Sequence, residues 1–68
     1  MNRIEALRHR VQRIKDADAK ELKRLYEDLI GYDPFEEGET IESVRATLLD
    51  YVKEECYATG VHVSEVGL

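Results

Sequence analysis

The side chains best suited to chemistry in this sequence are two histidines and one cysteine, and their spacing matches no catalytic or metal-binding pattern. His9 and His62 lie far apart, and neither forms a CxxC, HxxxH or HExxH pattern with Cys56. Nothing near Cys56 supplies a base for a nucleophilic thiol, and its helical spacing from Val52 and Leu48 predicts a small core residue. We therefore expect no enzyme, no metal and no cofactor.

The acidic stretch around Asp33 contains enough carboxylates to raise the question of calcium. When Asp33 and Gly38 are placed at positions one and six of an EF-hand loop, Phe35, Ile41 and Val44 fall on ligand positions. Apolar side chains cannot coordinate the ion, and the last of these positions normally carries a bidentate glutamate. The sequence therefore excludes an EF-hand.

The basic side chains gather in the first third of the chain. Residues 1–24 carry a net charge of +4 and the rest −9, which gives −5 overall. Arg3, Arg10 and Arg13 could contact nucleic-acid phosphates. However, the chain is acidic as a whole, and no aromatic residues alternate with the arginines for base stacking. The simpler interpretation of these arginines is that they form a solvated helix face, or a face that pairs with the acidic third helix.

Three stretches with helical periodicity must position these side chains, and they predict an all-α fold. We expect a small three-helix domain with helices over about 3–15, 19–30 and 40–59. Residues with capping side chains mark the helix starts at Asn2, Asp18 and Thr40. Glycines, which readily adopt left-handed backbone conformations, mark the helix ends at Gly31 and Gly60. Glu21, three residues after Asp18, suits a reciprocal capping arrangement.

The connections are less regular. No glycine or proline separates the first two helices, so one long bent helix is an alternative, although Asp18 would then interrupt its apolar stripe. Residues 31–39 form an acidic irregular loop with a turn at Asp33-Pro34. Residues 61–66 alternate apolar and polar side chains without an evident strand partner, which predicts an extended C-terminal tail.

The helical stripes also predict the core and a mode of association. We expect the core to comprise Leu7, Val11, Leu22, Leu25, Leu29, Val44, Leu48 and Val52. The second and third helices offer wide apolar faces that can cover each other. Part of the first stripe (Ile4, Leu7, Val11 and Ile14) would then lack an intramolecular partner, and a dimer would bury it. In the alternative, the first helix docks as the third member of a monomeric bundle.

Residues 21–52 resemble the helix–extended loop–helix pattern of SAP and LEM-type modules. The resemblance is carried by Leu22, Leu25, Gly31, Pro34, Ile41, Val44 and Leu48. SAP-like DNA binders are basic in the loop and second helix, whereas this loop carries Asp33, Glu36, Glu37 and Glu39. The resemblance therefore implies a LEM-like protein-binding use rather than DNA binding.

The length and composition of the chain indicate how many domains it has and where it is located. Sixty-eight residues are enough for one domain, over 1–68. A lone cysteine fits the reducing cytoplasm, which is the expected location. No apolar run is long enough to span a membrane. The expected function is a small non-enzymatic protein-interaction or regulatory module, with a protein partner that could be a second copy. The candidate interaction residues are Arg3, Arg10, Arg13, Leu7 and Val11. The alternative is a nucleic-acid-associated module that uses the basic N-terminal helix.

Overall fold

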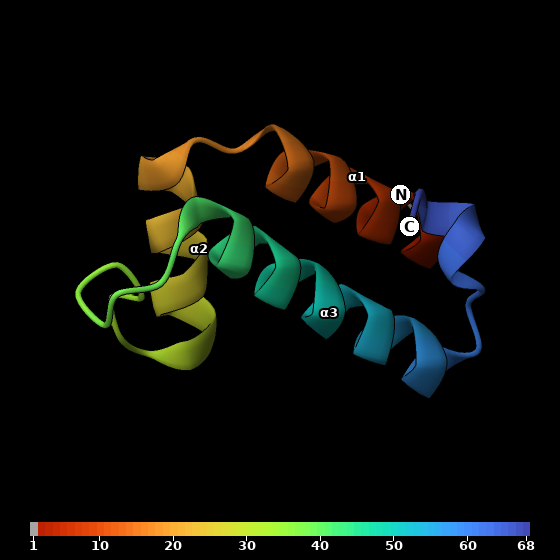
Figure 1. Ribbon diagram of the computed structural model, residues 1–68. Helices are drawn as coiled ribbons and strands as arrows, with labels where there is room; N and C mark the ends of the chain where they lie inside the picture. Colours follow the sequence, from red (N-terminus) through yellow and green to blue (C-terminus); the bar gives the residue numbers. More distant parts are fainter. Residues whose placement is uncertain (1) are drawn as a thin grey trace.

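The computed structural model describes residues 2–68, which form three α-helices and one short 3-10 helix (Figure 1). The elements are α1 (Arg3–Asp16), α2 (Ala19–Ile30), α3 (Ile41–Thr59) and η1 (Val63–Val66). No strand occurs within these residues. The predicted all-α three-helix fold is confirmed, with helix boundaries that differ from those expected by no more than one residue.

Each helix begins directly after the residue whose side chain was expected to cap it. The capping oxygen accepts a hydrogen bond from the backbone N–H three residues later, at 2.8 Å for Asn2, 2.9 Å for Asp18 and 3.1 Å for Thr40. Gly31 and Gly60 follow α2 and α3 with φ of 105° and 75°. Because residues other than glycine rarely adopt such φ values, these two glycines end the helices at little cost.

The first two helices are separate. The backbone turns extended at Ala17 (ψ 138°) and Asp18 (ψ 179°), so the alternative of one long bent helix is wrong. The reciprocal half of the expected capping arrangement is absent, because the Glu21 carboxylate instead accepts a hydrogen bond from Nε of Arg13 at 2.7 Å. Glu21 thereby ties the start of α2 to α1.

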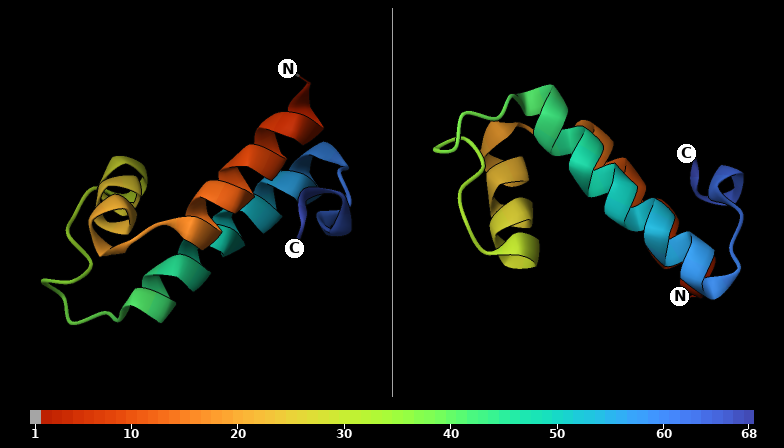
Figure 2. Two further views of the ribbon diagram at one scale, coloured as in Figure 1. Left: turned by 90° about the horizontal axis from the view of Figure 1, so that it is seen from above. Right: turned by 60° about the horizontal axis from the view of Figure 1, so that its bottom comes forward.

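Helices α1 and α3 run antiparallel side by side, and α2 crosses the pair at one end (Figures 1 and 2). Both long helices also contact η1 at the opposite end. The buried apolar side chains lie along the line where these elements meet: Leu7, Val11, Ile14, Ala17, Leu22, Tyr26, Val44, Leu48, Val52, Cys56 and Val66. Six of the eight predicted core residues are among them, and so is Cys56.

The other two predicted core residues lie on α2. Leu25 is only partly buried, and Leu29 is 48% exposed, so its assignment to the core was wrong. Periodicity places Leu29 on the same stripe as Leu22. However, the buried face of α2 is formed by Leu22 and Tyr26, with Ile30 partly buried beside them. Leu29 therefore lies at the edge of the buried face of α2.

The apolar stripe of α1 has an intramolecular partner. Leu7, Val11 and Ile14 are between 2% and 6% exposed, because α3 covers them from one side and η1 from another. The expectation that part of this stripe remains uncovered was wrong. Helix α1 instead docks as the third member of the bundle, which was the alternative.

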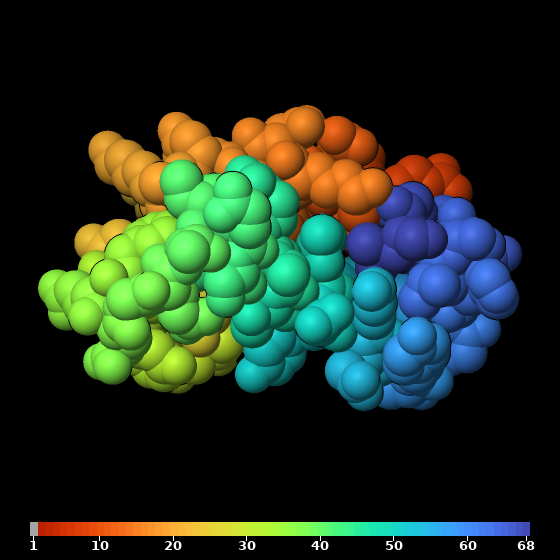
Figure 3. Space-filling model, in the orientation of Figure 1, coloured from red at the N-terminus to blue at the C-terminus, as the bar shows by residue number. Residues whose placement is uncertain are grey.

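The C-terminal tail is folded rather than extended, so that expectation was wrong as well. Val66 is 1% exposed and belongs to the core, and the tail fills one end of the α1–α3 pair (Figure 3). Two basic side chains of α1 hold it: Arg8 Nη2 donates to the Glu65 carbonyl at 2.9 Å, and Lys15 Nζ to the Gly67 carbonyl at 2.6 Å. The alternating sequence is thus compatible with a 3-10 turn that buries one valine.

The acidic loop 31–39 is fixed by a hydrogen-bonded cluster. The Tyr26 hydroxyl lies 3.2 Å from that of Tyr32 and donates to the Glu39 carboxylate at 3.1 Å. Ser43 Oγ, on α3, donates to the same carboxylate at 3.0 Å. The two tyrosine rings meet edge to face with centroids 5.5 Å apart. This cluster joins the loop to both α2 and α3.

Candidate functional site

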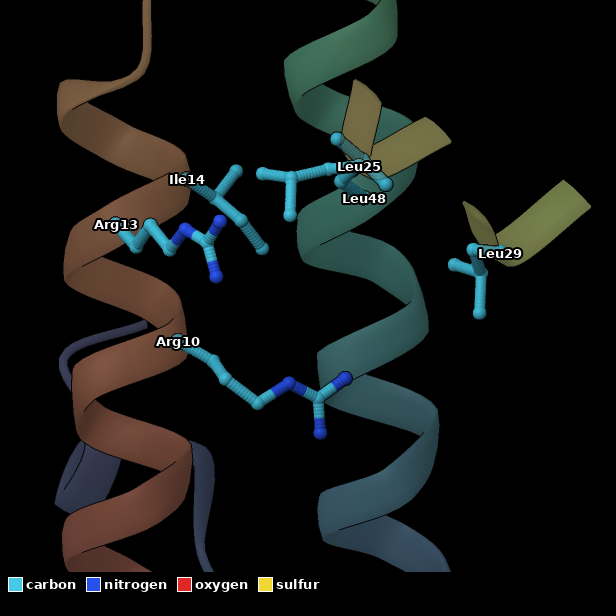
Figure 4. A pocket seen from close by; sticks show the side chains of 6 residues that line it. All are labelled: Arg10, Arg13, Ile14, Leu25, Leu29 and Leu48. Carbon is cyan, nitrogen blue, oxygen red and sulfur yellow. The ribbon is translucent and has the colours of Figure 1, made fainter. Parts of the chain in front are cut away.

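The C-terminal half of α2 forms one wall of a groove of about 230 Å³, which we call the α2 groove. Its lining residues come from all three helices: Arg10, Arg13, Ile14, Leu25, Leu29 and Leu48 (Figure 4). In this view Ile14 points from α1 toward the side of the groove that Leu25 and Leu48 line. The groove exists because α2 crosses the α1–α3 pair and leaves a corner beside the crossing.

The floor and one wall of the groove are apolar. Ile14 and Leu48 are 6% and 4% exposed, so they form a fixed floor that belongs to the core. Leu25 is half-buried beside them, and Leu29 stands on the wall with 48% of its surface in solvent. A partner that covered Leu29 would remove this leucine from water without rearranging the core.

The opposite side of the groove is a basic rim formed by Arg10 and Arg13 of α1, and Arg10 extends across to α3 (Figure 4). Each guanidinium already forms an ion pair within the chain, Arg10 with Glu55 and Arg13 with Glu21. Both arginines remain about half-exposed. Such exposed pairs stabilise a fold by at most about 1 kcal/mol, so they can exchange partners at small cost.

The structure separates the candidate interaction residues into two groups. Arg10 and Arg13 lie together at the α2 groove, and Arg3 is exposed near the start of α1. Leu7 and Val11 lie inside the core, at 3% and 2% exposure. A partner could not reach these two side chains while α3 and η1 cover them.

Sequence reasoning missed two contributors to this region. Leu29 was assigned to the core, but it lies at the edge of the buried face of α2, which periodicity alone does not reveal. Arg45 was overlooked: its Nη2 donates to the Ala17 carbonyl at 2.6 Å and its Nε to the Ile14 carbonyl at 3.2 Å. Arg45 thereby caps the end of α1 and fixes the floor of the groove.

The residues first considered for chemistry do not come together. Cys56 is fully buried, His9 is exposed on α1, and the His62 ring lies 2.7 Å from the Ser64 hydroxyl at the start of η1. Over residues 2–68, no group of three or more histidine, cysteine, aspartate or glutamate side chains is arranged to hold a metal ion. Cys56, His9 and His62 therefore do not share a site.

Comparison with known proteins identifies no relative: no family model, curated protein or solved structure matches this chain. The resemblance of residues 21–52 to SAP and LEM-type modules thus gains no support. In the part of the chain that the structure describes, no helix is long and apolar enough to cross a membrane.

Proposed function

We propose that this protein is a non-enzymatic protein-interaction module whose α2 groove binds a helix of a protein partner. The observation that carries this proposal is Leu29, a large aliphatic side chain that is 48% exposed beside a concave apolar floor. Single exposed leucines are ordinary on protein surfaces. A leucine that forms the wall of an apolar groove is instead typical of a surface that receives a partner's side chains.

The shape of the corner favours a helix as the bound segment. A helix laid beside α2 would contact it on one side and the α1–α3 pair below, as a further member of a helical bundle. Its own backbone hydrogen bonds are satisfied internally, so it needs only side-chain contacts from the groove. The groove supplies these as apolar contacts at its centre and charged groups at its rim.

The arrangement of the basic side chains supports a protein partner over a nucleic acid. Arg10 and Arg13 each have a carboxylate beside them, and phosphates would be repelled by Glu55 and Glu21 at the same place. Arg8 and Lys15 donate to the carbonyl groups of the tail. Helix α1 therefore uses much of its basic face within the chain.

Site-specific photo-crosslinking tests the proposal. A photoreactive phenylalanine analogue at position 29 should crosslink a protein in the native host, with the crosslinked peptide mapped by mass spectrometry. The same analogue at position 57 is the matched control, because Tyr57 is 64% exposed and lies away from the groove on α3. Crosslinks at 29 but not at 57 support the proposal; their absence at 29, or equal crosslinking at both positions, contradicts it.

A further inference from the structure

We propose that the helix bound in the α2 groove is α2 of a second copy of this chain, so that two copies form a two-fold symmetric dimer. This inference rests on the function proposed above and identifies its partner. In a two-fold interface the same surface of both copies must be complementary to itself. Both the shape and the charges of the α2 groove have this property.

The shape is self-complementary because one surface carries both a projecting side chain and a hollow. Leu29 projects from α2, while Ile14, Leu25 and Leu48 line the floor beside it (Figure 4). When two such surfaces face each other, Leu29 of each copy fills the groove of the other. The exposed leucine and the open floor of both copies are then covered together.

The charges are self-complementary because the groove has a basic and an acidic rim. Arg10 and Arg13 form the basic rim on α1. Glu21 and Asp28 are seven residues apart and so share one face of α2, next to Leu25, and Glu21 pairs with Arg13 of the same copy; we call these two acids the acidic rim. A two-fold axis between the rims places the basic rim of each copy against the acidic rim of the other. The pair Arg13–Glu21 then exchanges partners between copies.

This mixture of charges also argues against other protein partners. A strongly acidic helix would meet Glu21 and Glu55, and a strongly basic helix would meet Arg10 and Arg13. Like charges brought together at an interface oppose binding. The groove therefore favours a partner helix that carries both signs, and α2 of a second copy has three basic and three acidic side chains.

Sedimentation equilibrium at roughly 100 µM tests this inference, a concentration that populates even a micromolar complex. We expect a dimer for the natural chain and a single 7.9 kDa species for Leu29→Asp. Tyr57→Glu is the matched control at another exposed site, and it should remain dimeric. Arg13→Glu should weaken the dimer at least tenfold, and the charge-swapped variant Arg13→Glu with Glu21→Arg should restore it.

A natural chain that stays at 7.9 kDa, or a dimer that persists in Leu29→Asp, would overturn the inference. Circular dichroism of each variant shows whether loss of the dimer reflects loss of the fold. The photo-crosslinking experiment separates this failure from failure of the proposed function. Crosslinks from position 29 to a different protein alone would retain the interaction module and reject the dimer, whereas crosslinks to a second copy would support both.

Discussion

Leu22 and Leu29 lie seven residues apart on the same stripe of α2, yet Leu22 is fully buried and Leu29 is 48% exposed. The difference arises because the buried face of α2 continues from Leu22 to Tyr26 and Ile30, which leaves Leu29 at its edge. The two leucines are therefore chemically identical probes of two different environments. One belongs to the fold and the other to the α2 groove.

Leu22→Ala and Leu29→Ala should differ sharply in their effect on stability. Truncation of a fully buried leucine costs about 2–5 kcal/mol, because it removes apolar contacts and leaves a cavity. An exposed position away from special features usually changes stability by no more than about 0.5 kcal/mol. Urea denaturation at low micromolar concentration, where association is minimal, measures both. Equal losses for the two variants would show that Leu29 is a core residue.

Arg45→Met should destabilise the fold by about 1.5–3 kcal/mol, the usual contribution of hydrogen bonds from a charged group. The methionine retains an aliphatic chain but cannot donate to the Ala17 and Ile14 carbonyl oxygens. Arg24→Met, at an exposed position on α2, is the control and should be nearly neutral. If the two variants melt at the same temperature, Arg45 does not cap α1.

Tyr26 should keep its proton in the folded protein at a pH where an unfolded tyrosine loses it. The pKa of Tyr26 is raised above the ordinary 10.0, chiefly by the hydrogen bond with Tyr32, then by burial and by the bond to the Glu39 carboxylate. A raised pKa in the folded state means that this contribution to stability is complete below pH 10 and is lost as the pH rises above it.

The measurement is the tyrosinate absorbance of the native protein followed through alkaline pH, together with stability against pH. One of the four tyrosines should ionise late, and Tyr26→Phe should remove this late step. The same variant should show a smaller loss of stability above pH 10 than the natural chain. A single step that includes all four tyrosines in the native protein would contradict the hydrogen-bonded cluster.

Nucleic-acid binding through α1 should be weak. Fluorescence anisotropy with generic duplex DNA and RNA should detect no complex tighter than micromolar near physiological salt, because Arg8, Arg10 and Arg13 have carboxylates or carbonyl groups beside them. A tight complex that weakens steeply with salt and is lost in the Arg10→Glu, Arg13→Glu variant would instead establish the nucleic-acid alternative.

Much of the fold could be predicted because its signals are local. The capping side chains of Asn2, Asp18 and Thr40 act within three residues of their own positions, so the helix boundaries follow from the sequence. Periodicity likewise identifies the buried stripes, as Val44 and Val52 show with no exposed surface. These features require no knowledge of how the helices are arranged.

The remaining features depend on contacts between distant parts of the chain. Val66 is buried because η1 packs against α1. Arg45, on α3, reaches the end of α1. Leu29 is exposed because it lies at the edge of the buried face of α2. Periodicity shows which side of a helix is apolar but does not show which neighbour covers it. The α2 groove was therefore missed, although Arg10 and Arg13 at its rim were identified.

Nuclear magnetic resonance of the isotope-labelled natural chain, diluted from about 1 mM to about 10 µM, tests most directly whether the α2 groove is the surface through which copies meet. We predict concentration-dependent amide shifts at Leu25, Leu29, Leu48 and Arg13, with Tyr57 and Val61, near the C-terminal end of α3, unchanged. Shifts confined to the C-terminal end of α3, or a spectrum that does not change with concentration, would contradict this prediction.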